Sequence, residues 1–397
     1  MENKEREVLL RVEELCQYFG KRKAVDNVSF EILKGEVFGL VGESGCGKTT
    51  TGRSIIKLYP LFSGNVIFKG RRIGAGTMAY RKEIKACKAK LRRLGGGSGD
   101  AVYECKKQIA ALKQKIKQAK FDSKYADREY AKSLTEKVKA EYGPRLAAVK
   151  GEEQALLRKQ YKEALRAAEK TKLVTGIQMI FQDPVASLNP RMTVREIIAE
   201  GLIINGVKDR EYIDRRVFET MELVGLVREH AGRYPHEFSG GQRQRIGIAR
   251  SIIMDPELLI ADEPVSALDV SVQAQVINLL NELRKTLDLT VLFIAHDLSV
   301  VKYFSDRIGV MYLGKIVELA TADELFAHPL HPYTKSLLSA IPLPDPKRER
   351  SRRRMVYDAL AEHDYSKDKP SMRQISPGHF VYCNAEEARR YQKELGL

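Results

Sequence analysis

The chain has few cysteines and no long apolar run. Its five cysteines are scattered and form no CxxC pair: Cys16, Cys46, Cys87, Cys105 and Cys383. This spacing argues against a disulfide framework and a structural zinc site, and it suits a reducing cytoplasm. No stretch of about 18 apolar residues occurs, so we expect no membrane-spanning segment. The charged start, Met1 to Arg6, lacks the apolar core of a signal peptide.

Acidic residues are scarce in one segment only. Residues 71–172 contain 28 Lys and Arg against 12 Asp and Glu. That excess equals the formal net charge of the whole chain, +16, so the remaining residues are neutral overall. The basic character must therefore be interpreted within this segment and not as a property of the whole protein.

A phosphate-binding motif lies near the N-terminus. Residues Gly42 to Thr49 match G-x-x-x-x-G-K-[ST], between an apolar run at 36–41 and a segment to Leu58 that can form a helix. In this context, backbone N–H groups of the loop can surround phosphate oxygens, and the helix dipole adds positive potential. Lys48 would then reach the β- and γ-phosphates, and the Thr49 hydroxyl would ligate Mg²⁺.

The rest of the globular sequence predicts an α/β fold with a mostly parallel sheet. We expect strands at 8–12, 24–32, 64–70, 177–181, 258–261 and 290–295, and helices at 193–230 and 246–253. The last three strands each end in polar residues, which an open parallel sheet would gather at one edge. These residues are Gln182, Asp262, Glu263 and His296.

That set of side chains suits ATP hydrolysis. Asp262 would ligate Mg²⁺, and Glu263 would orient and deprotonate the attacking water. Gln182 can bridge metal and water, and His296 can hydrogen-bond the γ-phosphate. A plain strand exit would explain Asp262 and Glu263 alone, but beside the phosphate loop we interpret them as catalytic.

Two further residues near the loop have open interpretations. An aromatic side chain in Tyr18-Phe19 could stack on a purine, or it could be an ordinary residue at a strand end. Cys46 lies beside Lys48 and a helix N-terminus, which favour a thiolate that alkylating reagents attack. Alternatively, Cys46 is a small residue tolerated at a variable position.

The basic segment at 74–172 is rich in Lys, Ala, Glu and Gln, which favour helix. We expect three helical pieces, at least two of them antiparallel, projecting from the body. The breaks are expected at Gly95–Asp100 and Gly143-Pro144. The segment is either a solvated protrusion or a surface for a partner or an anionic surface.

Together the motifs resemble the nucleotide-binding subunits of ABC transporters. The phosphate loop, Gln182 of the Q-loop, the Ser239–Gln242 signature, Asp262-Glu263 of Walker B, Asp269 of the D-loop and His296 of the switch follow the family's order. The resemblance covers residues 8–73 and 173–325. It implies an ABC-type domain (1–73 and 173–325) with a P-loop core, an antiparallel β subdomain and a helical subdomain at 186–245. The insertion at 74–172 interrupts it, and an extension at 326–397 follows.

The resemblance also implies the roles of the site residues. The expected ATP contacts are Phe19, with Tyr18 as the fallback, and Gly42, Ser44, Gly45, Cys46, Gly47, Lys48, Thr49 and Thr50. The expected catalytic residues are Lys48, Gln182, Glu263 and His296, and the expected Mg²⁺ ligands are Thr49, Gln182 and Asp262. Two cassettes would close head to tail over two ATP molecules, with Ser239, Gly241 and Gln242 contacting the partner's ATP.

Two stretches resemble the oligopeptide/dipeptide importers, and the second ATPase subunit of that importer most closely. These are residues 182–193 and 328–338, and Phe238 in the signature also fits. The resemblance implies an ATPase that energises import of peptides or a related small solute. It would lie on the cytoplasmic face of the membrane as a peripheral protein. Its partners would be two integral-membrane permease subunits, a second ABC ATPase and, indirectly, a solute-binding protein.

The chain departs from that group in two places. Relatives have a short linker where this chain has the basic insertion. Many relatives carry a cysteine cluster in the tail, but here only Cys383 is present, and one thiolate cannot hold a four-cysteine iron–sulfur cluster. We therefore expect no iron–sulfur cluster. The run Arg350–Arg354 is solvated or contacts anionic headgroups.

The alternative is a nucleic-acid-associated ABC ATPase that uses the basic insertion in translation or repair. Translation-type relatives carry two cassettes on one chain, whereas this sequence has one phosphate loop and one signature. Repair-type relatives use zinc modules, which Cys87 and Cys105 do not form. The insertion also has few aromatic residues for base stacking. We therefore expect no nucleic-acid partner.

Overall fold

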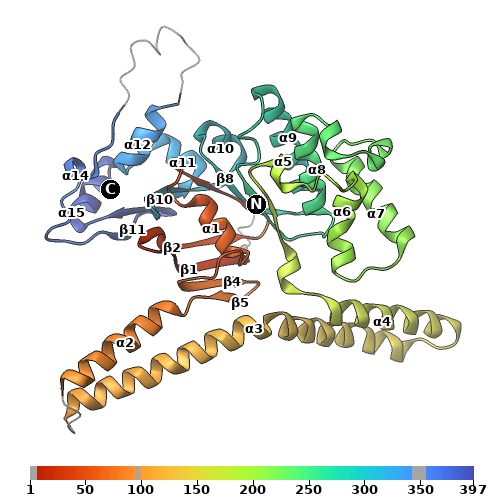
Figure 1. Cartoon of the computed structure of the whole chain (residues 1–397), viewed down its shortest axis with the longest axis horizontal. Helices are drawn as coiled ribbons and strands as arrows, with labels where there is room; N and C mark the ends of the chain where they lie inside the picture. The colour runs from red at the N-terminus through yellow and green to blue at the C-terminus, as the bar shows by residue number, and fades with distance from the viewer. Residues whose placement is uncertain (1–6, 95–98, 342–354) are drawn as a thin grey trace.

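Apolar strands that alternate with helices form a large central sheet (Figure 1). The computed structural model describes residues 7–94, 99–341 and 355–397. Five parallel strands make the centre of this sheet, in the order β9 (Arg307–Tyr312), β3 (Val37–Val41), β8 (Thr290–Ala295), β7 (Leu258–Asp262) and β6 (Ile177–Ile180). Every residue of β3, β7 and β8 is buried, as expected for strands covered on both faces. The predicted mostly parallel sheet is confirmed.

Helices that follow these strands complete the α/β core. They are α1 (Lys48–Ile55), α8 (Gly240–Ile252), α9 (Val270–Leu287) and α10 (Leu298–Phe304). Between β6 and α8 lie α5 (Pro184–Ser187), α6 (Val194–Ile204) and α7 (Arg210–Leu223). Helices α6 and α7 bury apolar side chains such as Ile198 and Val217 in the same core cluster as β7 and β8. The helical layer is therefore packed onto the sheet edge that carries β6 (Figure 1).

A second, antiparallel sheet packs beside the first. Its order is β2 (Arg22–Leu33), β1 (Val8–Phe19), β4 (Ser63–Phe68) and β5 (Arg71–Ala75). The strands predicted at 8–12 and 24–32 are both longer than expected, and they meet in a tight turn at Gly20, which has φ +62°. The rings of Phe30 and Phe38 stack with centroids 5.0 Å apart and join the two sheets.

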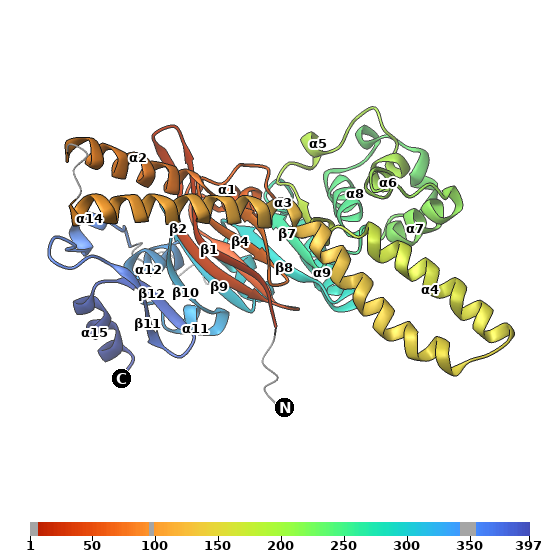
Figure 2. The same ribbon diagram turned by 90° about the horizontal axis from the view of Figure 1, so that it is seen from below.

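The basic segment forms three helices, α2 (Met78–Arg93), α3 (Asp100–Ala148) and α4 (Glu152–Lys170). Figure 2 shows α2 against one half of α3 and α4 against the other half. The predicted break at Gly143-Pro144 is wrong, because α3 continues through Pro144 among strong helix formers. The chain turns instead at Gly151, whose φ of +75° suits glycine. Most of the break expected at Gly95–Asp100 lies outside the described residues.

The middle of α3 does not project, because it is docked on β5. Ser123 Oγ donates a hydrogen bond to the Ile73 carbonyl at 3.0 Å, and Arg72 pairs with Asp122 at 3.1 Å. Ala126 is 4% exposed and belongs to the apolar cluster beneath the antiparallel sheet. The expectation of a projecting protrusion therefore holds only for the two ends of the insertion (Figure 2).

The C-terminal residues extend the central sheet. Beyond β9, the order continues antiparallel through β10 (Lys315–Thr321), β12 (His379–Cys383) and β11 (Ser371–Ser376). In the described part of this region they are accompanied by α11 (Ala322–Ala327), α12 (Pro332–Ser339), α14 (Ala359–Glu362) and α15 (Ala385–Glu394). The run Arg350–Arg354 lies outside the described residues. Among the helices of the described ranges, none has the length and apolarity needed to cross a bilayer.

We expect Ala126→Glu to loosen the contact between α3 and β5, because the larger, charged side chain does not fit the apolar contact that buries Ala126. The cost should be about 2 kcal/mol or more, visible as a lower midpoint in thermal unfolding. The control is Ala111→Glu, the same change at an exposed position of the same helix. Equal midpoints for the two variants would show that α3 is not held at this point.

Candidate functional site

A cavity of about 400 Å³ lies where the carboxyl ends of the parallel strands meet the antiparallel sheet. Its lining includes nine of the predicted site residues: Phe19, Ser44, Gly45, Gly47, Lys48, Thr49, Thr50, Gln182 and Glu263. Arg22 and Ala24 also line it. The phosphate loop, the Q-loop residue and the carboxylate after β7 are thus brought together from segments far apart in the chain.

The phosphate loop adopts a conformation that only glycine suits. Gly45 and Gly47 have φ of +79° and +113°, and a Cβ on Gly47 would lie 2.3 Å from the Ala24 carbonyl oxygen. Helix α1 begins directly after Gly47, and no side chain caps its N-terminus. The N–H groups of its first turn are therefore available for phosphate oxygens, and the helix dipole favours that negative charge.

Lys48 is buried at the base of the loop. Its ammonium donates to the Gly42 carbonyl at 2.7 Å and to the Glu43 carbonyl at 2.9 Å. One carboxylate oxygen of Glu263 lies 4.0 Å from it. The positive charge is therefore held between the loop and the strand ends, where the β- and γ-phosphates of a nucleotide would lie.

Thr49 and Asp262 form a pair of oxygen donors beside Lys48. The Thr49 hydroxyl donates to Asp262 Oδ1 at 2.8 Å. Asp262 is fully buried, and its Oδ2 has no hydrogen-bond partner among the described residues. Burial raises the pKa of Asp262, while the Thr49 bond and Arg53 oppose that rise. A hydroxyl next to an orphaned carboxylate oxygen is the donor set that Mg²⁺ prefers, so these residues fit the ion.

Two polar side chains converge on Glu263. Gln182 donates its amide N–H to Glu263 Oε2 at 3.1 Å, and His296 Nδ1 lies 3.1 Å from the same oxygen. Glu263 itself has a φ of +45°, uncommon for a residue with a side chain, and its N–H donates to the Ile294 carbonyl. The backbone and both neighbours therefore fix the carboxylate at the edge of the cavity.

The aromatic position is occupied by Phe19. Its ring lines the cavity, is 46% exposed and packs edge-on against Tyr59. Tyr18 instead donates a hydrogen bond to Asp26 at 2.8 Å and packs on Phe62. The preference for Phe19 over Tyr18 is consistent with this geometry.

Sequence reasoning missed Arg22. It pairs with Phe19 across the turn at Gly20, lines the cavity, and donates to the Gly45 carbonyl at 3.4 Å. Its proximity to Phe19 in the sequence was the available signal, since a hairpin turn places both side chains near the loop.

Of the two interpretations of Cys46, the structure favours the unreactive one. Its thiol is 5% exposed, and burial raises the pKa of the Cys46 thiol despite the nearby Lys48 charge. A desolvated thiol keeps its proton and is inaccessible to reagents. Cys46 and Gly42 were both predicted to contact ATP, but neither residue lines the cavity. Gly42 has a φ of +149°.

The signature residues lie at the start of α8, away from this cavity. Ser239 Oγ accepts the Gln242 N–H at 3.3 Å, and the Gln242 side chain accepts the Ser239 N–H, so the two form a capping box. A Cβ on Gly241 would lie 2.6 Å from the Val272 side chain, so the close approach of α9 requires glycine. Within one chain, Ser239, Gly241 and Gln242 do not line the cavity at the phosphate loop.

A second cavity lies between β6, α6 and α8. Its volume is about 830 Å³, and its lining includes Gln178, Gln182, Ala186, Ile204 and Arg250. Ile204 is 72% exposed, whereas Arg250 is anchored by a hydrogen bond to the Ser187 carbonyl at 2.6 Å. Gln182 therefore lines both cavities, one on each side of the segment after β6.

Comparisons with known proteins agree with this arrangement. The family profile described as ABC transporter matches residues 25–141 and 146–266, and the profile for the oligopeptide/dipeptide transporter C-terminal region matches residues 317–365. The chain is 47% identical to the oligopeptide transport ATP-binding protein OppF of Bacillus subtilis, over 97% of this chain and 99% of that protein. It is 45% identical to the dipeptide transport ATP-binding protein DppF of Lactococcus lactis, over 95% and 93%.

Solved structures support the fold. CbiO1 from Clostridium perfringens superposes with a TM-score of 0.51 at 21% identity, covering 81% of this chain and 91% of that one. The ATP-binding cassette MJ1267 gives 0.52 at 20% identity, covering 83% and 98%. With the family profiles and close relatives, these findings show that the protein is an ATP-hydrolysing member of the ABC transporter family that carries the C-terminal region of its oligopeptide/dipeptide transporters.

Proposed function

We propose that this chain hydrolyses ATP to energise the import of oligopeptides, dipeptides or a related small solute through a membrane permease. The observation that carries the proposal is Gln182, which lines both the cavity at the phosphate loop and the groove beside α6. A residue shared by a nucleotide site and a second surface can transmit the state of one to the other. The names of the relatives OppF and DppF support peptides as the cargo.

In the proposed mechanism, the N–H groups of the loop and the Lys48 ammonium bind the phosphates of ATP, and Phe19 stacks on its base. The Glu263 carboxylate accepts a proton from the attacking water, and His296 and Gln182 hold that carboxylate in place. When bound between Thr49 and Asp262, Mg²⁺ supplies positive charge that stabilises the leaving phosphate oxygens. Arg22 and Phe19 close the cavity at the side of the antiparallel sheet.

The chain is proposed to work with a second ABC ATPase, identical or homologous. Ser239, Gly241 and Gln242 do not line the cavity at their own phosphate loop, yet they form a Gly-rich helix N-terminus, which attracts anions. A head-to-tail pair would bring this segment of each chain to the γ-phosphate held by the other. Two composite sites would then form, and hydrolysis would require both chains.

The groove of about 830 Å³ is the proposed docking surface for the permease. It combines exposed apolar side chains, such as Ile204, with the anchored Arg250, a mixture that suits a polar-rimmed protein contact. Docking at this groove would hold the chain at the cytoplasmic face of the membrane as a peripheral subunit. A solute-binding protein on the opposite face would then contribute only indirectly.

We expect Glu263→Gln to abolish turnover and leave ATP binding intact, because the amide keeps the shape but cannot accept the proton. The loss should be about 100-fold or more in kcat, measured as phosphate release, with ATP affinity from an equilibrium titration. Glu282→Gln, the same change on the exposed surface of α9, is the control. Normal turnover in Glu263→Gln would contradict the catalytic role.

We expect Ile204→Glu to separate hydrolysis from docking, since a charge in the groove disfavours an apolar contact but leaves the ATP cavity unchanged. With its partner ATPase present and the permease absent, the variant should keep its ATPase rate, while its recovery with detergent-solubilised permease should fall strongly. Val227→Glu changes another exposed apolar residue that does not line the groove and serves as the control. Equal recovery of both variants would rule out the groove as the docking surface.

A further inference from the structure

The C-terminal extension reaches the phosphate loop through one hydroxyl group. Tyr333 lies near the start of α12, is 1% exposed, and accepts a hydrogen bond from the backbone N–H of Glu43 at 3.0 Å. Its ring packs between Tyr312 and Tyr357, with centroids 4.4 Å and 5.5 Å away. Burial raises the pKa of Tyr333, so the hydroxyl stays neutral. Tyr333 is therefore a fixed, neutral contact behind the loop.

The contact acts on the peptide that holds Lys48. The N–H of Glu43 and the carbonyl of Gly42 belong to one planar, trans peptide group, so they point in opposite directions. On the far side, the Gly42 oxygen accepts a hydrogen bond from the Lys48 ammonium at 2.7 Å. Gly42 has a φ of +149°, which leaves that peptide free of the usual side-chain restraint. The Tyr333 hydroxyl therefore fixes the orientation of a carbonyl that positions Lys48.

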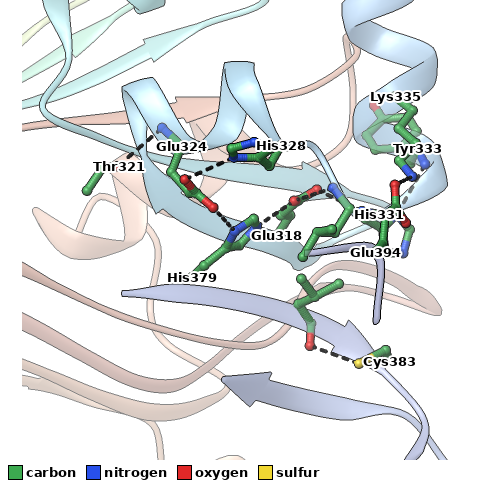
Figure 3. Close-up of polar contacts among 12 residues, drawn as sticks. Glu318, Thr321, Glu324, His328, His331, Tyr333, Lys335, His379, Cys383 and Glu394 are labelled. Carbon is green, nitrogen blue, oxygen red and sulfur yellow. Dashed lines mark hydrogen bonds and ion pairs between the residues drawn. The ribbon is translucent and has the colours of Figure 1, made fainter. Parts of the chain in front are cut away.

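A buried network holds Tyr333 in turn (Figure 3). His331 caps α12, and its Nδ1 accepts the Tyr333 N–H at 3.1 Å. Burial lowers the pKa of His331 to about 3, so the imidazole is neutral and can accept this bond. The segment before the helix is fastened by Glu318 of β10, whose two carboxylate oxygens accept the N–H groups of Leu330 and His331 at 2.8 Å and 3.0 Å.

The same glutamate connects the network to the last strands of the sheet. His379 of β12 contacts Glu318 through Nε2 at 2.8 Å and Glu324 of α11 through Nδ1 at 3.3 Å (Figure 3). Burial lowers the pKa of His379, but the bonds to the two carboxylates outweigh it and raise the pKa overall. A continuous series of hydrogen bonds therefore runs from β12 through Glu318 and the start of α12 to the phosphate loop.

We propose that Tyr333 is a positioning residue for Lys48 and that, through it, the C-terminal extension sets the affinity of the site for ATP. The inference rests on the proposed function in one respect, that ATP binds at this loop. Lys48 contacts the phosphates both before and during hydrolysis, so its orientation affects binding more than the rate of the chemical step. The C-terminal extension thus supports the phosphate loop through Tyr333 and also adds β11 and β12 to the central sheet.

The test is Tyr333→Phe in the full chain, which removes the hydroxyl and keeps the buried ring. The Kd and KM for ATP should rise about three- to tenfold, as expected for one lost neutral hydrogen bond, and kcat should change less than about twofold. Tyr357→Phe is the matched control, since it removes a hydroxyl from the same aromatic cluster without touching the loop. Its ATP affinity should equal that of the unchanged chain.

A lower unfolding temperature for Tyr333→Phe with unchanged ATP affinity would overturn the proposal, because the hydroxyl would then be structural only. If Tyr333→Phe does not fold, His331→Ala and His331→Asn make the same test. Asparagine can cap the helix and alanine cannot, so affinity should fall in the first variant and recover in the second. Failure of the unchanged chain to bind ATP would instead refute the proposed function, which keeps the two outcomes distinct.

Discussion

The site depends on holding one buried ammonium group beside a loop that presents backbone N–H groups to an anion. Lys48 is surrounded by the loop carbonyls of Gly42 and Glu43 and by the carboxylate of Glu263. A buried charge is costly unless several partners compensate it, so the surrounding elements must stay in place. Strands β3, β7 and β8 are buried along their whole length and closely packed. This rigid sheet holds the phosphate loop and Glu263 in fixed positions around Lys48.

Two side chains connect the nucleotide site with elements outside the rigid parallel core. Gln182 follows β6, the strand at the edge of the parallel sheet, and it contacts Glu263 on one side and lines the groove beside α6 on the other. Tyr333 contacts the loop from the C-terminal elements, which lie beyond β9 at the end of the sheet opposite to β6. Both residues lie at the borders of the parallel core, Gln182 beside α6 and Tyr333 in α12. Gln182 and Tyr333 therefore each connect elements outside the parallel core with the nucleotide site.

Sequence reasoning predicted the parallel core, which the structure confirms, and it proposed a catalytic set at one edge of that core, because both predictions depend on local patterns. Apolar runs that end in polar residues predict buried strands with their site at the carboxyl edge, and Asp262 and Glu263 lie there. It could not identify Tyr333, since that contact spans 290 positions of the sequence and its partner is a backbone N–H. Arg22 was missed for a similar reason, because its place follows from the register of β1 and β2 and not from its residue type. The two interpretations of Cys46 stayed open because the sequence shows its proximity to a lysine but not its burial, which raises the pKa of the thiol.

The charge of the insertion at 74–172 is unevenly distributed in the structure, which its composition alone does not show. Its basic excess left open a solvated protrusion or a binding surface, and it did not reveal that three acidic residues of α3 lie within eight positions where the helix meets the body. Asp122 pairs with Arg72, Glu129 with Arg71, and Asp127 accepts the N–H of Val174. These contacts surround the buried Ala126 and pair the arginines of β5 at the docking point, and most lysines of the insertion lie in the two projecting hairpins. Intrinsic propensity favours this helix but does not place it, and the packing of α2, α4 and β5 against it determines where it lies. The charge of the insertion is thus a property of its free ends, and those ends are the part that remains available to an anionic surface.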